Sequence, residues 1–474
     1  MSKQHTEIAR RYLGSDATWS SAGLVPGNRK TLPAASTLMA ETSAMGEPQA
    51  RAEARWLIWE TALALGIVPA SINDLYMARG RGEAPSTFTA PAINLRMLSF
   101  DAARAVFRAA RVRRAGAIIF EIARSEMGYT DQRPAEYAAS VLAAAICEGW
   151  SGPVFIQGDH FQVSAKKYAS APEAELQAIR DLIAESIQAG FYNIDIDTST
   201  LVDLNRSTVH EQQMLNAHLC AAFTAFIRTH QPKGLEISVG GEIGEVGGRN
   251  STEEELRAYL QLYGVELDRL AGSALGLSKI SIQTGTSHGG VVLPNGSIAQ
   301  VAVDFGTLLR LSRVARSQYG LAGAVQHGAS TLPENAFRNF PQNEACEVHL
   351  ATNFQNIAFD HLPADLREEI FAWTREHCAD ERKPTDTDEQ FIYKARKKAI
   401  GPFKTKMWTL PDAARAPIRE AWEKQFGFLF DQLGVGDTAD LVSTYVKPVA
   451  LHKSVADFGG KASEPDEAAR DLAD

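Results

Sequence analysis

The sequence has little cysteine, and the few cysteines it has are far apart. Its 474 residues include four, Cys147, Cys220, Cys346 and Cys378, and no two have the spacing of a metal-binding or redox motif. A disulfide framework and a cysteine zinc cluster are therefore not expected. We take all four as ordinary thiols.

Long apolar segments and positive charge are also scarce. No apolar run approaches the ~20 residues that a membrane-spanning helix needs, and the start, MSKQHTEIARRYLGSD, lacks the apolar region of a secretory signal. With 48 Lys and Arg against 57 Asp and Glu the formal charge is −9, which disfavours nucleic acid or an anionic membrane as the main partner. We expect a cytoplasmic globular protein.

From residue 91 onward, short apolar segments alternate with amphipathic helical segments. The expected strands cover residues 91–95, 116–123, 152–158, 191–197, 235–241, 279–285, 323–328 and 346–351. The expected helices cover residues 100–113, 134–148, 173–189, 210–229, 253–271, 299–319 and, shorter, 334–340. About eight strands alternating with helices over ~250 residues predict an α/β fold, the (β/α)8 TIM barrel. No Gly-x-Gly-x-x-Gly follows the first strand, so a dinucleotide-binding sheet is disfavoured.

The chain divides into four expected segments. Residues 1–89 form an N-terminal arm and helical extension, with a loose arm up to residue 50 and a helix over residues 51–65. Residues 90–360 form the TIM-barrel catalytic domain, and residues 361–455 form a C-terminal helical extension. Residues 456–474 are acidic and poor in apolar side chains, so we expect a disordered tail.

Side chains of the metal-ligand type collect where the expected strands end. Asp159 and His160 follow the third strand, Glu242 follows the fifth, His288 follows the sixth, and His327 lies at the end of the seventh. Barrel enzymes build their active sites on this rim. Each histidine alone suits a structural, hydrogen-bonded role. Three of eleven histidines at glycine-flanked strand ends favour a shared, catalytic site for a divalent metal such as Zn²⁺.

Short segments around these positions form a wider pattern. They are Pro-Ala-Ile-Asn at 91–94, Asp-His at 159–160 with Ala-Lys-Lys at 165–167, Asp-Ile-Asp-Thr-Ser at 195–199, Glu-Ile-Gly and Gly-Gly within 242–248, Gly-Thr-Ser-His-Gly at 285–289 and His-Gly-Ala-Ser at 327–330. In this strand order, over residues 90–355, the chain resembles a divergent member of the class II, metal-dependent fructose-bisphosphate and tagatose-bisphosphate aldolases.

The resemblance implies reversible aldol cleavage through a metal-stabilised enediolate. One divalent ion, Zn²⁺, is expected per chain, and an assisting monovalent cation stays open. His160, Glu242, His288 and His327 match the family's metal ligands. Glu245 competes with Glu242 for one ligand position, and Glu242 is favoured because it keeps the family's spacing to the Gly-Gly pair.

Asp159 matches the family residue that moves a proton at the hydroxyl of the bond-forming carbon. The alternative for Asp159 is to orient a ligand histidine without touching substrate. Lys166 and Lys167 are expected to cover the surface of the loop after the third strand, because a metal makes a lysine Schiff base unnecessary.

The substrate contacts are only partly kept. The residues that match substrate or phosphate contacts of the family are Asn94, Gly289, Gly328, Ser330 and Thr352. After the last strand the family has Asn-x-Asp-Thr, whereas this chain has His349-Leu350-Ala351-Thr352. His349 could donate to an anion in place of the lost contacts. We therefore predict an aldolase of altered substrate, acting on a phosphorylated ketose or a close analogue.

Two other functions stay open at this point. One is a non-catalytic, aldolase-like barrel subunit that stabilises a true aldolase. The other is a different metal-dependent barrel enzyme, an epimerase or a hydrolase. The expected partners are a small sugar phosphate and further copies of this chain in a homo-oligomer, with no nucleic acid and no membrane.

Two polar segments have simpler explanations beside their functional ones. Ser251 and Thr252 with Glu254 and Glu255 predict a helix capping box where the family has a mobile acidic loop. The basic segment 394–404 is either a solvated helix face or a site that reaches a neighbouring barrel mouth and binds a phosphate or sulfonate.

Overall fold

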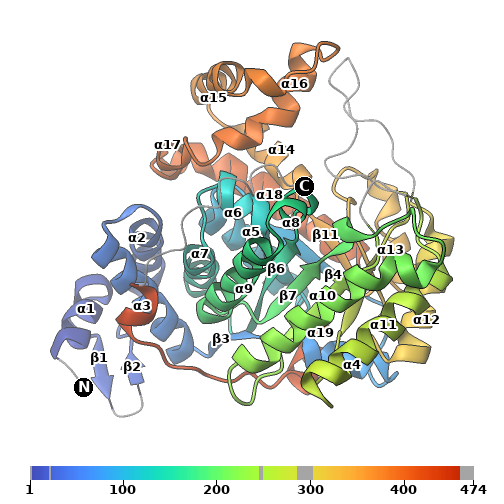
Figure 1. Cartoon of the computed structure of the whole chain (residues 1–474). Coiled ribbons are helices and arrows are strands. Elements are labelled where there is room, and N and C mark those ends of the chain that lie inside the picture. Colours follow the sequence, from blue (N-terminus) through green and yellow to red (C-terminus); the bar gives the residue numbers. More distant parts are fainter. Residues whose placement is uncertain (1–2, 21–22, 245–248, 286–302, 460–474) are drawn as a thin grey trace.

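The computed structural model describes residues 3–20, 23–244, 249–285 and 303–459 (Figure 1). Its centre is a closed sheet of eight parallel strands: β4 (Ala90–Asn94), β5 (Ile119–Ala123), β6 (Gly152–Gln162), β7 (Asn193–Asp197), β8 (Ser238–Glu242), β9 (Lys279–Ile282), β10 (Ala324–Gln326) and β11 (Glu347–Leu350). The hydrogen-bonded order is β6-β5-β4-β11-β10-β9-β8-β7, and β6 pairs with β7 to close the ring. This confirms the predicted (β/α)8 barrel.

Helices surround the strands, close to the positions that the sequence predicts. They are α5 (Ser99–Arg113), α7 (Pro134–Cys147), α9 (Pro172–Ala189), α10 (Val209–His230), α11 (Glu253–Ala271), α12 (Phe305–Tyr319) and the short α13 (Asn339–Gln342). Thr252 and Glu255 form the capping box of α11, as predicted. The two side chains satisfy backbone N–H groups that the first turn leaves without partners, and so set the start of the helix.

Residues 1–50 are more regular than their composition predicts. Their described part contains α1 (Lys3–Leu13), a hairpin of β1 (Thr18–Ser20) and β2 (Gly23–Val25), and α2 (Leu32–Met45), followed by α3 (Pro48–Ala64). The expectation of a loose arm is wrong here. α2 is held by packing against both α3 and α7, and such packing stabilises a helix whose own sequence is not strongly amphipathic.

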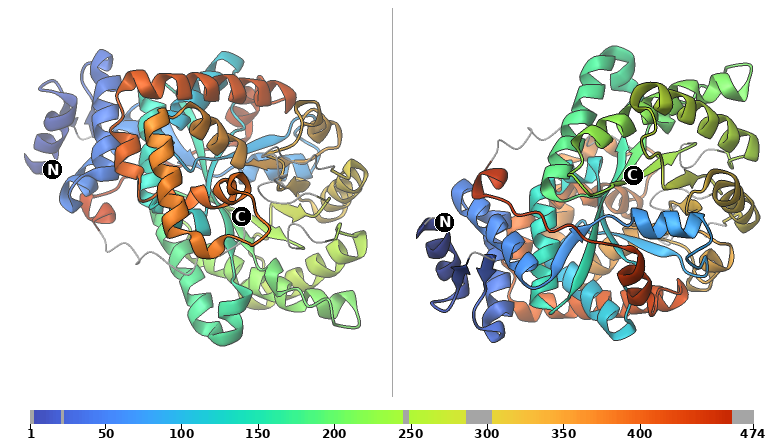
Figure 2. Two further views of the ribbon diagram at one scale, coloured as in Figure 1. Left: turned by 90° about the horizontal axis from the view of Figure 1, so that it is seen from above. Right: turned by 90° about the horizontal axis from the view of Figure 1, so that it is seen from below.

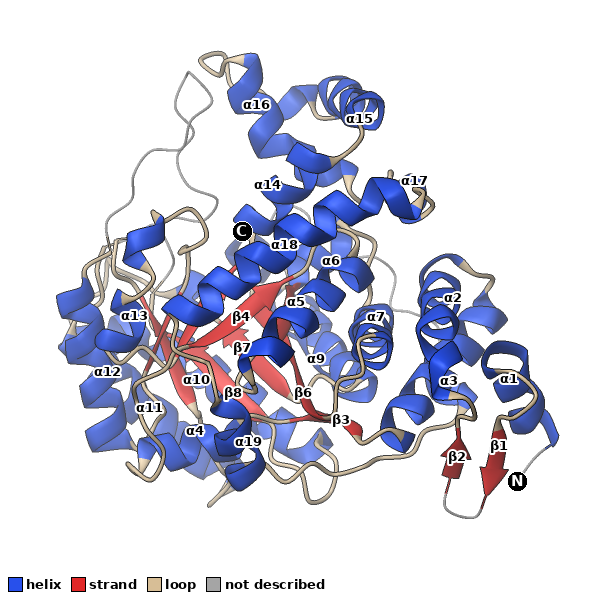
Figure 3. Ribbon diagram, turned by 180° about the vertical axis from the view of Figure 1, so that it is seen from behind, coloured by secondary structure: helices blue, strands red, loops and turns tan. Residues whose placement is uncertain are grey.

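The N-terminal extension also adds a strand at the base of the barrel, which the sequence did not indicate. β3 (Ile67–Ala70) pairs in parallel with residues 152–155, before β6 meets β7 (Figure 3). Asn193 accepts a hydrogen bond from the Ile72 N–H and donates one to the Ala70 carbonyl. β3 thereby supplies hydrogen-bond partners for the backbone of residues 152–155, which precede the part of β6 that pairs with β7.

The C-terminal extension is helical, as predicted. It consists of α14 (Thr352–His361), α15 (Ala364–His377), α16 (Asp388–Ala395), α17 (Lys404–Trp408), α18 (Asp412–Gln432) and α19 (Thr438–Tyr445). α18 packs on α5, while α15, α16 and α17 form a group on the side of α14 (Figure 1). The Gly401 N–H donates to the carbonyl of Tyr129, at the end of α6 (Arg124–Tyr129), so the extension contacts the rim after β5. No helix in the described ranges is both long and apolar enough to span a membrane.

The basic segment of this extension forms ion pairs inside the protein. Lys394 Nζ lies 2.8 Å from an oxygen of Asp386, and Lys404 Nζ lies 2.7 Å from an oxygen of Glu136, a residue of α7. These two charges are neutralised locally. Lys394 and Lys404 are therefore paired within their own fold, although the Lys394 side chain is still 48% exposed.

After α19, residues 446–459 return to the N-terminal helices, and we call them the C-terminal strap (Figure 2, seen from below). The indole N–H of Trp56 donates to the Lys453 carbonyl at 2.9 Å, and that of Trp59 donates to the Leu451 carbonyl at 2.7 Å. The strap ends in a short 3-10 turn, Val455–Phe458, packed against α3. The start of the expected acidic tail is thus ordered, and residues 460–474 lie outside the described residues.

We predict that Arg79→Ala strongly destabilises the barrel. Arg79 is fully buried at the end of α4 (Asn73–Gly80) and donates to the carbonyls of Phe88, Glu344 and Ala345. Removing the guanidinium leaves these acceptors buried without donors, which costs ~3 kcal/mol or more in total. The midpoint of chemical denaturation should fall accordingly, whereas Arg81→Ala, at an exposed neighbouring position, should leave it unchanged. Equal midpoints for the two variants would contradict this role.

Candidate active site

β6 carries two of the expected site residues side by side. Its register with β7 shifts between Gly158 and Phe161, and His160 has a positive φ of 39°. Neighbouring side chains of a regular strand point to opposite faces, but this bulge turns both Asp159 and His160 into the barrel interior. A Cβ at Gly158 would lie 2.3 Å from the Phe161 ring, so the bulge requires glycine at that position.

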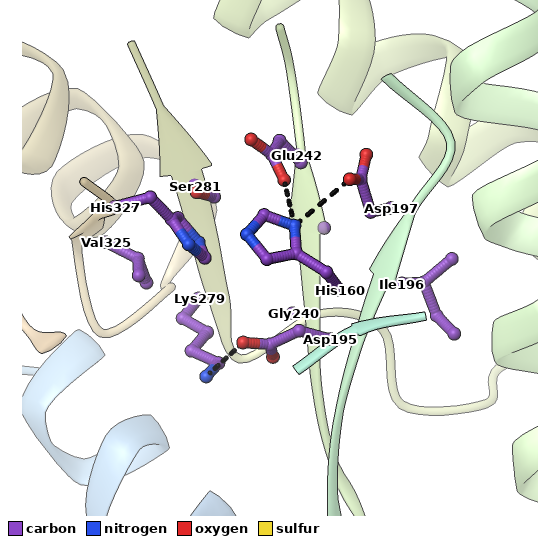
Figure 4. Close-up of a pocket in the computed structure, with 11 residues that line it drawn as sticks. His160, Asp195, Ile196, Asp197, Gly240, Glu242, Lys279, Ser281, Val325 and His327 are labelled. Atoms are coloured by element: carbon purple, nitrogen blue, oxygen red, sulfur yellow. Dashed lines mark hydrogen bonds and ion pairs between the residues drawn. The ribbon is translucent and has the colours of Figure 1, made fainter. Parts of the chain in front are cut away.

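Three expected ligands meet at the mouth of the barrel (Figure 4). His160 from β6, Glu242 from β8 and His327 after β10 each offer a ligand atom, and these atoms lie within 4.8 Å of one another. The Nδ1 atom of His160 is 3.4 Å from Glu242 Oε2, and the rings of His160 and His327 have centroids 4.3 Å apart. We call these three residues the mouth cluster. All are more than nine-tenths buried.

The electrostatics of the mouth cluster favour a bound cation. Burial, and then the charge of Asp197, raise the pKa of Glu242 to about 8 despite the neighbouring His160. Burial also acts to raise the pKa of Asp197, but hydrogen bonds from His160, Ser199 and Gln162 hold it below its usual value. Two carboxylates therefore face one imidazole in a buried space. Two histidine nitrogens and a carboxylate oxygen are a donor set that suits Zn²⁺ and similar ions.

Below the mouth cluster, the barrel axis contains charged side chains instead of an apolar core. The Nζ atom of Lys279 from β9 lies 2.8 Å from Asp195 Oδ2 and 2.5 Å from Glu347 Oε1, and also donates to Gln157. Burial raises the pKa of Asp195 to about 6, although Lys279 opposes this. Lys279 is completely buried and held by three acceptors, so it is a structural cation.

His349 lies in this inner layer. It was expected to contact an anionic substrate group, but it is 5% exposed and surrounded by carboxylates. Its Nδ1 atom lies 3.0 Å from Glu121 Oε2 and 3.1 Å from Asp159 Oδ1, and its Nε2 atom lies 2.7 Å from Glu347 Oε1. Such surroundings repel an anion. His349 instead fixes the position of Asp159.

The other expected substrate contacts occupy two places on the rim. The Asn94 amide donates to Glu126 at 2.5 Å, so it is held by α6, the helix that follows β5. Ser330 Oγ accepts from the Ala351 N–H at 2.7 Å, which joins the loop after β10 to the start of α14, where Thr352 is the first residue. Gly328 has a φ of 67°, a left-handed value that suits glycine. His288, Gly289 and Glu245 lie outside the described residues.

Several residues of the site were not singled out as functional from the sequence. Glu121 lies inside a short, otherwise apolar strand, and Lys279 and Glu347 begin short, completely buried strands. A charged residue in such a strand is the signal that could have revealed them, because it is buried only with a partner. Asp195 and Asp197 belong to a segment of the family pattern, but no functional role was predicted for them.

The parallel eight-stranded barrel carries histidines and carboxylates at its carboxyl-terminal mouth. This is the place where (β/α)8-barrel enzymes build their active sites. The chain belongs to the class II fructose-bisphosphate aldolase family, whose model matches residues 84–408. The family supports aldolase-type, lyase chemistry. Its members are typically metal-dependent, and the mouth cluster is a possible metal-binding group.

Solved structures are similar at low sequence identity. A protein described as a probable tagatose 6 phosphate kinase, from Sinorhizobium meliloti 1021, is 16% identical, with a TM-score of 0.54 over 74% of this chain and 100% of that chain. A fructose-bisphosphate aldolase from Campylobacter jejuni is 17% identical, with a TM-score of 0.46 over 78% of this chain and 97% of that chain. The first of these supports the barrel fold. A search among curated proteins found no match.

Proposed function

We propose that this protein is a Zn²⁺-dependent class II aldolase that cleaves a phosphorylated ketose, or a close analogue, by a reversible retro-aldol reaction. The observation that carries the proposal is the mouth cluster of His160, Glu242 and His327, next to Asp159, in a barrel of this family. His288 is proposed as a further ligand. A homo-oligomeric state is part of the same proposal.

The chemistry divides between the ion and the side chains. A divalent ion held by the mouth cluster would act as a Lewis acid on the substrate carbonyl, where negative charge develops during cleavage. Asp159 takes the proton from the hydroxyl of the carbon whose bond to its neighbour breaks, and returns it in the reverse direction. The hydrogen bond between Asp159 and His349 holds the carboxylate in place for this transfer.

The phosphate group is proposed to bind at the two joined loops. The Ser330 hydroxyl holds the Ala351 N–H at the start of α14, and helix N-termini with glycine-rich turns favour anions. Gly328, Ser330 and Thr352 are the proposed contacts there, with Gly289. Asn94 is proposed to contribute from the end of β4, the strand that pairs with β11.

A substrate screen tests the proposal directly. The purified protein, reloaded with Zn²⁺, is incubated with a series of phosphorylated ketoses, and the release of a triose phosphate or aldehyde is measured with a coupled assay. We expect cleavage of at least one ketose and none after removal of the metal. Products with an unchanged carbon skeleton would indicate an epimerase, release of inorganic phosphate would indicate a hydrolase, and no turnover by the fully metal-loaded protein would favour a non-catalytic subunit.

We predict that fructose 1,6-bisphosphate is a poor substrate. Ala351 stands where the family has an aspartate, so a substrate hydroxyl loses its acceptor, which costs ~1–3 kcal/mol or ~10–100-fold in kcat/KM. Ala351→Asp should recover ~10-fold or more of the activity toward fructose 1,6-bisphosphate. A kcat/KM of the unmodified protein within the ~10⁴–10⁸ M⁻¹s⁻¹ range of ordinary enzymes for this ketose would contradict the prediction.

A further inference from the structure

Arg396 differs from the rest of the basic segment 394–404 because it is buried. It begins the short 3-10 turn η5 (Arg396–Ala399), which lies between α16 and α17 in the chain, and it is 8% exposed. Arginine stays charged at any physiological pH. Burial opposes that charge and lowers the pKa of the guanidinium from its usual value. A charge in such a place needs an anion or a set of acceptors as partner.

The other buried arginines have such partners. Among the described residues there are five. Arg79 donates to three backbone carbonyls. The other four pair with buried carboxylates: Arg96 with Glu126, Arg124 with Glu175, and both Arg415 and Arg419 with Asp101. The fold therefore compensates buried guanidinium groups as a rule, and Arg396 is the exception.

The guanidinium of Arg396 uses little of its hydrogen-bonding capacity. Within the described part of the chain its one hydrogen bond runs from Nη2 to Asn356 Oδ1, at 2.7 Å, and its Nε atom is buried without a hydrogen-bond partner. The charge of Asp360 acts in favour of the guanidinium charge, but Asp360 is exposed and forms no ion pair with Arg396. A buried donor without an acceptor is rare in folded proteins unless a bound ion or water satisfies it.

Two aromatic rings hold the guanidinium in place. Its Cζ atom lies 4.5 Å from the ring centroid of Phe359 on α14 and 5.0 Å from that of Tyr393 on α16. The amide of Asn356 donates to the Tyr393 hydroxyl at 3.1 Å, which fixes the amide oxygen that Arg396 contacts. The rings attract a cation but carry no negative charge. Arg396 is thus positioned in advance while its charge stays uncompensated.

A second guanidinium lies near the first. Arg367 belongs to α15, which packs against η5, and its Nη1 atom donates to the Asp360 carbonyl at 3.4 Å. The charge of Arg367 opposes that of Arg396. Two like charges destabilise each other unless an anion is bound close to them. This place lies where the helices of the C-terminal extension meet above the barrel (Figure 1).

We propose that Arg396 and Arg367 form an anion site for a phosphate group, which we call the extension site. The planar fork of arginine matches the oxygens of a phosphate and binds them in pairs. A phosphate group carries up to two negative charges near neutral pH, so one such group balances both guanidinium groups. Free phosphate and a phosphorylated metabolite both offer this chemistry. The inference does not depend on which ketose is cleaved.

The extension site is separate from the barrel mouth but connected to it. The side chains that surround Arg396 belong to α14 and α16, and not to the barrel strands. Asn356 is four residues after Thr352 on α14, or ~6 Å along the helix axis. A phosphate bound at the extension site would tie α14 to α15 and η5. It would thereby hold the helix whose first residue is a proposed substrate contact.

Equilibrium dialysis with radiolabelled inorganic phosphate tests the extension site. The full-length, Zn²⁺-loaded protein is compared with Arg396→Met and with a control, Lys394→Met, which alters an exposed lysine of the same segment that is paired with Asp386. The unmodified protein and the control should each bind one phosphate per chain that Arg396→Met binds ~10-fold or more weakly. Phosphate at the barrel mouth is common to all three proteins. Equal binding by all three would overturn the proposal.

Chemical denaturation separates a ligand role from a structural one. In phosphate-free buffer Arg396→Met should unfold at the same denaturant concentration as the unmodified protein or a higher one, because methionine removes the cost of burying the charge. Added phosphate should raise the midpoint of the unmodified protein more than that of the variant. A lower midpoint for the variant together with an equal gain from phosphate would show a purely structural role, and the proposal would be wrong.

Two additions complete the test. If Arg396→Met does not fold, as judged by circular dichroism, Arg367→Gln replaces it with the same expected weakening, and unchanged phosphate binding then refutes the site. Competition identifies the source of the phosphate group. Displacement of the label by both glycerol 3-phosphate and inorganic phosphate supports a phosphorylated metabolite, and displacement by inorganic phosphate alone supports the free ion. Chloride that competes as well as phosphate would contradict a site for phosphate.

Discussion

A His160→Asn variant should lose the ion of the mouth cluster, and cleavage of the ketose should fall ~10³-fold or more. Asparagine is chosen because it tolerates a positive φ, which position 160 has. A divalent ion supplies several kcal/mol of transition-state stabilisation, and ~4 kcal/mol corresponds to ~10³ in rate. Metal analysis and initial-rate measurements on the same preparations test the loss of the ion and the fall in cleavage.

The glutamate ligand is tested with a matched pair. Glu242→Ala should lose the mouth ion and the activity, whereas Glu245→Ala should keep both. The reverse pattern would show that Glu245 is the ligand. Full activity of the metal-free protein would contradict the metal mechanism as a whole.

Asp159→Asn should lower turnover ~10²–10⁴-fold, the usual contribution of a positioned acid or base. The substitution keeps the shape of the side chain and removes its ability to take a proton. We expect KM to change far less than kcat, because the amide still fills the same space. Initial rates over a range of ketose concentrations give both parameters.

The metal content of this variant decides between the two roles of Asp159. Asp159→Asn should leave the ion of the mouth cluster in place. Its loss would mean that Asp159 orients a metal ligand and does not itself move the substrate proton.

The barrel was predictable because its signals are local. Strand segments such as residues 119–123 are short and mostly apolar, and the helices between the strands have regular apolar spacing. β3 and α2 were missed for physical reasons. β3 contains Pro69 and is ordered by pairing with β6, and α2 is stabilised by the helices on either side of it. Neither partnership is visible in the segment's own sequence.

The residues of the candidate site likewise divide into those that the sequence reveals and those that it does not. The residues of the mouth cluster could be found because histidine and glutamate at strand ends have a chemical meaning of their own. The inner layer could not, since the importance of Lys279 depends on its contacts with Asp195 and Glu347, which come from strands far apart in the sequence. For the same reason, His349 was assigned to the substrate before its carboxylate neighbours were known.

The C-terminal strap has a consequence for biosynthesis. Trp59 and its partner Leu451 are 392 residues apart. At a ribosomal rate of ~5–20 residues per second, Trp59 emerges roughly 20–80 s before that partner. Throughout this interval both indoles lack the hydrogen-bond acceptors that the strap supplies in the finished protein. Residues translated late therefore complete the packing of residues translated early.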